Sequence, residues 1–208
     1  MLLLHDYFRS SAGYRVRIAL NLKRVAYARH EVKLLEDEQL SPEHRARHPQ
    51  GLVPALEVDG RILTQSFAIL DWIEAHYPEP RLFPADPAAR AAAIARAMVV
   101  GADIHPINNL RVMRRLERDI GATAEQRSAW THHWMAEGFA ALEAMAGDGP
   151  FLGGDAPDIS DVFLIPQLFN ARRFDVPLDA YPKLLRADAA AQALPAFADA
   201  HPEHVKPA

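Results

Sequence analysis

The chain has 208 residues, of which 27 are acidic and 23 are basic, and half of all residues are hydrophobic. This composition indicates a globular protein with one large domain or two small domains that share a core. The net charge of −4 argues against nucleic acid or an anionic membrane as the main partner. Because the chain has no cysteine, disulfides, thiolate zinc sites and catalysis by a protein thiol are excluded.

The N-terminal stretch MLLLHDYF has no basic segment and is too short for a signal peptide, and the apolar runs are too short to span a membrane. We therefore expect a cytoplasmic protein that begins with a strand.

Apolar runs and turn signals in the first 77 residues predict the order βαβαββα. Ser10 or Ser11 is a natural N-cap for the first helix, in which Arg15 and Arg17 fall outside the broad apolar face. Asp59-Gly60 is a strong hairpin signal. The expected strands cover residues 2–7, 27–35, 55–58 and 61–63, and the expected helices begin after residue 10, at residue 42 and at residue 65.

The stretch YPEPRLFPADP has four prolines in eleven residues, which is typical of a stiff linker between domains. After it the chain has helical patterns. We expect helices at 88–116, broken near Gly101 and Pro106, at 124–145, at 158–173, and after Pro182. The predicted organisation is an α/β domain at 1–78, a linker at 79–87 and an all-α domain at 88–208.

Several stretches, in order along nearly the whole chain, resemble the zeta class of cytosolic glutathione transferases. They are RSSAGYRVRIAL at 9–20, LVPAL at 52–56, QSFAIL at 65–70, GADIHPINNLRVMRRL at 101–116, DISDVFLIP at 158–166 and NARRF at 170–174. The resemblance implies a thioredoxin-like N-terminal domain, a C-terminal helical-bundle domain, glutathione as cofactor and a homodimer. Two positions depart from the pattern: Ala12 replaces a cysteine, and Gln39 stands where a histidine is expected.

The resemblance implies a glutathione-dependent cis–trans isomerase that acts on maleylacetoacetate or maleylpyruvate in aromatic catabolism. Reversible addition of a thiolate would turn the cis double bond into a rotatable single bond, so no strong protein base is needed. Two alternatives stay open: a general zeta-type glutathione transferase or dehalogenase, and a non-catalytic interaction protein with the same fold.

The predicted catalytic residues lie where the first strand turns into the first helix. Glutathione's thiol has a pKa of roughly 8.5, and a helix N-terminus with a serine hydroxyl favours its thiolate. Ser10 is the predicted sulfur ligand, Ser11 is the reserve candidate and Arg9 lies beside them. The competing interpretation is that either serine is merely an N-cap.

The resemblance also implies which residues bind glutathione and substrate. Val53 would pair with glutathione through its backbone, Pro54 would be cis, and Ser66 would bind the γ-glutamyl carboxylate at a helix N-terminus. Cofactor contacts are expected from Ser10, Gln50, Val53, Pro54, Gln65, Ser66, Asp103, His105 and Asn108. For His105 and Asn108, which flank the break in the helical pattern at Pro106, a role in the core or in a helix kink is the equal alternative, and Asp103 would reach glutathione across the dimer interface. A diacid substrate needs guanidinium groups, which match carboxylates with two parallel hydrogen bonds, and these are expected from Arg9, Arg111 and Arg173.

The remaining polar motifs have simpler interpretations. His44 and His48 are four residues apart but have no third ligand nearby, so we expect no metal site. Asp158 and Asp161 fit a helix cap, and Arg172 is expected to be solvated next to Arg173.

Overall fold

The computed structural model describes residues 1–207 and divides into two compact units. The first unit contains Met1–Leu82 together with the C-terminal segment from Gln192 onward, and the second contains Phe83–Ala191. This grouping differs from the expected one, in which residues 88–208 formed a single helical domain. The difference lies in the C-terminal segment, which packs with the α/β unit.

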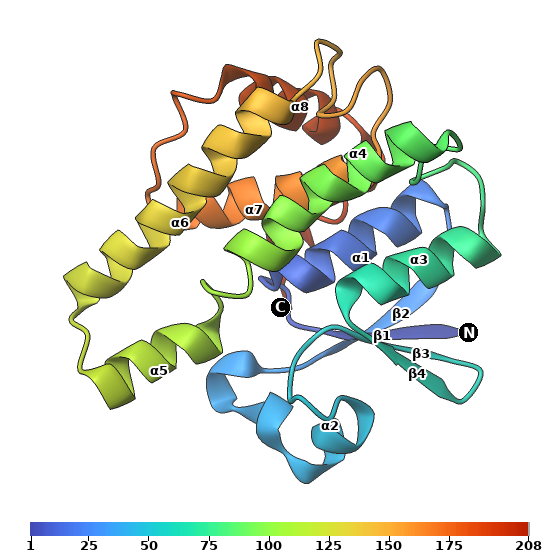
Figure 1. The fold of residues 1–208 in the computed structure, drawn as a ribbon. Coiled ribbons are helices and arrows are strands. Elements are labelled where there is room, and N and C mark those ends of the chain that lie inside the picture. Colours follow the sequence, from blue (N-terminus) through green and yellow to red (C-terminus); the bar gives the residue numbers. More distant parts are fainter. Residues whose placement is uncertain (208) are drawn as a thin grey trace. The chain divides into compact units, whose positions relative to one another are not determined.

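The first unit is built on a four-stranded mixed sheet (Figure 1). The strands are β1 (Leu2–Asp6), β2 (Tyr27–Glu31), β3 (Ala55–Val58) and β4 (Arg61–Thr64), in the spatial order β2-β1-β3-β4. β1 is parallel to β2 and antiparallel to β3, and β4 returns antiparallel to β3. Asp59 and Gly60 have φ values of 48° and 76°, as the predicted two-residue hairpin requires.

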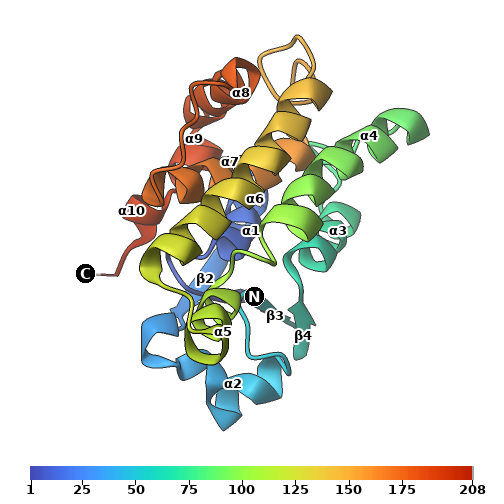
Figure 2. The same ribbon diagram turned by 60° about the vertical axis from the view of Figure 1, so that its left-hand side comes forward.

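Helices cover both faces of this sheet. α1 (Ser11–Leu22) and α3 (Ser66–His76) lie side by side on one face, and α2 (Pro42–Arg47) lies toward the other, as Figures 1 and 2 show. Between the sheet and the helix pair is a core with fully buried side chains such as Leu4, Ile18, Leu56 and Ile69. The predicted thioredoxin-like order βαβαββα is confirmed.

The second strand is shorter than predicted. β2 ends at Glu31, and the chain continues through two 3₁₀ turns, η1 (Leu34–Glu36) and η2 (Glu38–Leu40). Asp37, between the two turns, has a left-handed backbone with φ 59° and redirects the chain. The apolar residues at 34 and 35 therefore belong to turns and not to a strand.

The C-terminal segment is anchored to α1, because side chains of α1 donate hydrogen bonds to backbone carbonyls of the segment. It forms two short helices, α9 (Pro195–Ala198) and α10 (Pro202–Val205). The Tyr14 hydroxyl donates to the Phe197 carbonyl at 3.4 Å, and Arg17 Nε donates to the Ala200 carbonyl at 3.1 Å. These bonds explain why the segment groups with the first unit.

The second unit is helical, as predicted. It contains α4 (Pro87–Met98), η3 (Val99–Ile104), α5 (Leu110–Ile120), α6 (Ala124–Met145), α7 (Ile159–Arg173) and most of α8 (Pro182–Gln192). α7 is buried along nearly its whole length and packs against α4. No helix among residues 1–207 is both long enough and apolar enough to cross a membrane.

The expected breaks in the 88–116 pattern are present. After α4 the chain forms the π-helical turn η3, in which His105 N–H donates to the Val100 carbonyl at 2.9 Å. A Cβ at Gly101 would lie 2.8 Å from the Phe163 ring, so this turn packs too closely for a side chain. Pro106 then ends the helix, and α5 starts afresh at its N-cap Asn109.

The predicted cap of α7 is confirmed as a capping box. Asp158 N–H donates to Asp161 Oδ2 at 3.0 Å, and Ser160 N–H donates to Asp158 Oδ1 at 2.7 Å. Asp161 Oδ1 also accepts from Leu152 N–H at 2.8 Å. Burial raises the pKa of the Asp161 carboxyl to about 7. These carboxylates therefore organise the start of the central helix.

Candidate functional site

Ser10 is the N-cap of α1. Its backbone is extended, with φ −65° and ψ 117°, and its Oγ accepts a hydrogen bond from Gly13 N–H at 3.1 Å. A hydroxyl has two lone pairs and one proton, so this acceptor role leaves the proton for a second partner. The capping role expected for Ser10 is confirmed, and it is compatible with donation to a sulfur atom.

The backbone at the start of α1 lies unusually close to the end of β1. A Cβ at Gly13 would fall 1.7 Å from Asp6 Oδ1, so only glycine fits there. Asp6 in turn forms a fully buried ion pair with Arg17, which also donates to the Phe8 carbonyl at 3.0 Å. Burial raises the pKa of Asp6 in spite of the arginine. This network fixes the turn that presents Ser10.

The neighbours of Ser10 differ in exposure. Ser11 is the first residue of α1 and is 6% exposed, whereas Arg9 is half-buried, with its guanidinium carbon 4.8 Å from the centroid of the Phe8 ring. Ala12, at the position of the family cysteine, is buried. Ser10 is thus the more accessible serine of the pair, which fits its rank as the first candidate.

A loop held by α2 precedes β3. The Val53–Pro54 peptide bond is cis, as the resemblance implies. Pro54 is buried and Val53 is half-buried. The ring of His44 bonds to the Leu52 carbonyl through Nε2 at 2.7 Å, and it stacks on His48 with ring centroids 6.5 Å apart. The two histidines therefore support this loop.

Gln50 and Gln65, both predicted cofactor ligands, lie together. Gln65 Nε2 donates to Gln50 Oε1 at 2.6 Å. Gln65 also has a positive φ of 66°, a strained conformation for a residue other than glycine. Strain of this kind concentrates at binding and catalytic sites, so the Gln65 backbone is itself a sign of function.

Ser66 opens α3 and is 8% exposed. Its Oγ accepts a hydrogen bond from Arg15 Nη1 at 3.1 Å. Arg15 and Arg17 are 2% and 0% exposed, although the helical pattern placed both outside the apolar face of α1. The pattern was wrong about these two residues because α1 is enclosed by the sheet, α3 and the C-terminal segment.

The expected contact residues of the second unit cluster around the break between α4 and α5. Asp103 is exposed in η3, His105 follows η3 and is half-buried, and Arg111 is exposed in the first turn of α5. Asn108 is 6% exposed, and its Nδ2 donates to the Ile104 carbonyl at 2.9 Å. Within the described residues, no hydrogen-bond partner is seen for the buried Asn108 Oδ1.

Arg173 is the last residue of α7 and is exposed. Its Nη1 donates to Asn170 Oδ1 at 3.3 Å, and its guanidinium carbon lies 5.0 Å from the centroid of the Phe174 ring. Arg172 is paired with Asp188 at 2.5 Å, and its side chain is still 47% exposed, in agreement with the expected solvated position. Both arginines are exposed and they differ in their contacts, since Arg172 pairs with a carboxylate and Arg173 donates to an amide oxygen.

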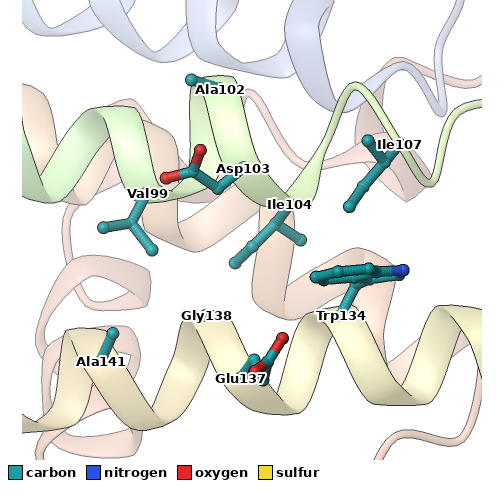
Figure 3. A pocket seen from close by; sticks show the side chains of 9 residues that line it. All are labelled: Val99, Ala102, Asp103, Ile104, Ile107, Trp134, Glu137, Gly138 and Ala141. Carbon is teal, nitrogen blue, oxygen red and sulfur yellow. The ribbon is translucent and has the colours of Figure 1, made fainter.

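A groove of about 470 Å³ lies within the second unit between η3 and α6 (Figure 3). Figure 3 shows Ile104 and Trp134 extending into the space between these elements. Asp103 and Glu137 also line the groove. A Cβ at Gly138 would lie 2.3 Å from Ile104 Cδ1, so this glycine permits the close approach of α6 to η3.

In the part of the chain that the structure describes, no three histidine, aspartate or glutamate side chains are grouped as metal ligands. The N-terminus of α1 presents the hydroxyl groups of Ser10 and Ser11 with the Arg9 guanidinium beside them. Such a site suits a ligand with its own nucleophile and several anionic groups.

Comparison with known proteins identifies the family. The model of the glutathione S-transferase N-terminal domain matches residues 4–81, and that of the C-terminal domain matches residues 122–201. Maleylacetoacetate isomerase of Pseudomonas aeruginosa is 46% identical over 202 residues, which cover 96% of this chain and 95% of that protein.

Solved structures agree with this assignment. Maleyl pyruvate isomerase in its holo form, a bacterial glutathione S-transferase of the zeta class, has a TM-score of 0.96 and 42% identity, with 98% of each chain covered. Maleylacetoacetate isomerase of Anaeromyxobacter dehalogenans with glutathione in its active site has a TM-score of 0.89 and 43% identity, with 99% of this chain and 97% of that chain covered. The chain therefore belongs to the zeta class of the glutathione S-transferase family.

Proposed function

We propose that this protein is a glutathione-dependent cis–trans isomerase that converts maleylacetoacetate or maleylpyruvate into the fumaryl isomer. The observation that carries the proposal is the Ser10 hydroxyl at the N-terminus of α1, in a chain without cysteine. The names of relatives that are more than 40% identical support the same activity. The reaction would serve the degradation of aromatic compounds such as tyrosine or gentisate.

The residues of the first unit fit glutathione. The tripeptide has a thiol and two terminal carboxylates, and the unit offers two helix N-termini, at Ser10 and at Ser66. Helix N-termini favour anions through their N–H groups and their dipole. The same unit also contains four further candidate contacts for glutathione, Gln50, Val53, Pro54 and Gln65. The strained backbone of Gln65 favours a binding role for this residue.

Bound glutathione would supply a thiolate that adds reversibly to the cis double bond and leaves after rotation about the resulting single bond. Ser10 would hold this sulfur by donating its proton, while its lone pair keeps the bond to Gly13 N–H. Each unit by which the site lowers the thiol pKa reflects about 1.4 kcal/mol of preference for the charged form. Ser11 is the reserve candidate for the same task.

The substrate is a dicarboxylate, and three arginines are proposed to bind it. Guanidinium groups form paired, charge-assisted hydrogen bonds with carboxylates. Arg9 lies next to Ser10, and Arg111 and Arg173 are exposed on the second unit. Asp103, His105 and Asn108 are proposed to contact glutathione or line its site.

Isomerisation of maleylpyruvate, followed by ultraviolet absorbance with and without glutathione, tests the proposal. We expect turnover only with glutathione, and a fall in kcat/KM of about 10-fold or more in Arg173→Ala, since one charged hydrogen bond contributes about 1.5–3 kcal/mol. Arg172→Ala is the matched control, because Arg172 is paired with Asp188. The kcat/KM values for maleylacetoacetate and maleylpyruvate are then compared to determine which of the two is the preferred substrate.

Two other outcomes would replace the proposal. Turnover of electrophiles without carboxylates, indifferent to Arg9 and Arg173, would identify a general transferase or dehalogenase. Failure to bind glutathione would leave a non-catalytic protein of this fold.

A homodimer and a cytoplasmic location complete the proposal. The groove between η3 and α6, with Ile104 and Trp134 in its lining, is a surface that a second copy could cover. The cytoplasm keeps glutathione reduced, as this chemistry requires.

A further inference from the structure

A buried arginine connects the two helices that carry the proposed glutathione ligands. Arg15 is on α1, five residues after Ser10, and is 2% exposed. Its Nη1 donates to Ser66 Oγ at 3.1 Å, across the packed pair α1 and α3 (Figure 1). Ser66 is the first residue of α3. The guanidinium therefore reaches the helix end that the proposed function assigns to the γ-glutamyl carboxylate.

The hydrogen bond from Arg15 fixes the direction of the Ser66 hydroxyl. Because the Ser66 oxygen accepts from a cation, its own proton must point to another acceptor. Acceptance from a charged donor also polarises the O–H bond and makes it a stronger donor. Ser66 is thus prepared to donate to an anion before any ligand arrives.

Two positive charges meet at this place. The N-terminus of α3 carries the positive end of a helix dipole, and the Arg15 guanidinium lies beside it. Like charges placed together in a buried position disfavour each other, and an anion relieves both. Burial lowers the pKa of Arg15 to about 9, which still leaves the side chain charged at neutral pH.

We propose that Arg15 is a positioning residue for glutathione: it orients Ser66 and places a positive charge behind the γ-glutamyl carboxylate. The inference rests on the proposed function and deepens it, because it names the part of the cofactor that Arg15 selects. Arg15 acts on binding, away from the reacting sulfur. Its loss therefore weakens glutathione binding while turnover at saturating glutathione is kept.

The test compares glutathione with 4-aminobutanoyl-Cys-Gly, which lacks only the γ-glutamyl carboxylate. Dissociation constants are measured by calorimetry for the wild type, Arg15→Met and the exposed control Arg61→Met. We expect the wild type and the control to prefer glutathione by about 10-fold or more, and Arg15→Met to lose most of this preference. KM for glutathione should rise in Arg15→Met, with kcat changed less than twofold.

The dissociation constants of Arg15→Met are informative only if this variant folds, so melting curves are recorded for every variant. If it does not melt cooperatively, Arg15→Gln and Arg15→Lys replace it, since both side chains carry N–H donors for Ser66. Charged Lys should retain the preference for glutathione, and neutral Gln should lose most of it. Equal preference in Gln, Lys and wild type overturns the inference.

Glutathione binding by the wild type separates a failure of the proposed function from a failure of the role given to Arg15. A wild type that does not bind glutathione at all removes the proposed function, and the role of Arg15 falls with it. A wild type that prefers glutathione, together with Arg15 variants that keep the same preference, overturns the inference alone.

Discussion

Ser10 illustrates how one side chain can serve the fold and the chemistry at once. Its lone pair caps α1 through Gly13 N–H, and its proton remains for a ligand. The capping and the catalytic interpretations of this serine are therefore compatible. Gly13 makes the arrangement possible, because any Cβ there would collide with the Asp6 carboxylate.

His48 gives a prediction about pH at the residue scale. Burial, and then the nearby His44, lower the pKa of His48 below its ordinary value of 6.5. As pH falls below about 6.5, the unfolded chain binds this proton before the folded chain does, so the contribution of His48 to stability falls. Urea denaturation at pH 7.5 and 5.5 should show that His48→Gln loses less stability on acidification than the wild type.

The control for this experiment is His133→Gln, at an exposed position of α6. It should follow the wild type at both pH values. An identical acid response in His48→Gln and the wild type would show that His48 does not titrate between the folded and unfolded states in the way its burial indicates.

At the scale of elements, α1 is the centre of the first unit. It packs on the sheet and against α3, and it holds the C-terminal segment through hydrogen bonds from Tyr14 to Phe197 in α9 and from Arg17 to Ala200 after α9. Its N-terminus presents Ser10, and its middle supports Ser66 through Arg15. A disturbance of α1 is therefore expected to reach both proposed ends of the glutathione site.

Replacement of Arg17 tests the structural role of α1. Arg17→Met leaves Asp6 as a buried carboxylate without its cation and removes the donors to the Phe8 and Ala200 carbonyls. We expect the free energy of unfolding to fall by about 3–5 kcal/mol, as for other broken buried ion pairs. The double variant Arg17→Met/Asp6→Asn should recover part of this loss. A loss below about 1 kcal/mol in urea denaturation would contradict the role given to the pair.

At the scale of the molecule, most elements were predictable because local chemistry marks their ends. Prolines open α2, α4 and α8, Asp158 caps α7, and Asp59-Gly60 forms the β3–β4 turn. The short C-terminal helices were not predicted. Each is four residues long. The segment that contains them is held by bonds from α1 to the carbonyls of Phe197, in α9, and of Ala200, between the two helices, which no local pattern encodes.

Some features of the candidate site could be predicted from the sequence and others could not. The helix start at Ser10 follows from capping preferences, and the cis bond at Pro54 follows only from the family resemblance, since few bonds before proline are cis. Arg15 was missed because a charged residue off the apolar stripe of a helix is normally solvated. Its burial results from tertiary packing around α1, which the sequence pattern of one helix does not contain.

The most direct measurement of the central claim is the pKa of the glutathione thiol in the complex, followed by the ultraviolet absorbance of the thiolate. In the wild type it should lie well below the roughly 8.5 of a free thiol. Ser10→Ala should move it back toward that value, at a cost of about 1 kcal/mol of stability for the lost cap, whereas Ser11→Ala should change it little. An unchanged pKa in Ser10→Ala would contradict the assignment of Ser10 as the group that holds the sulfur.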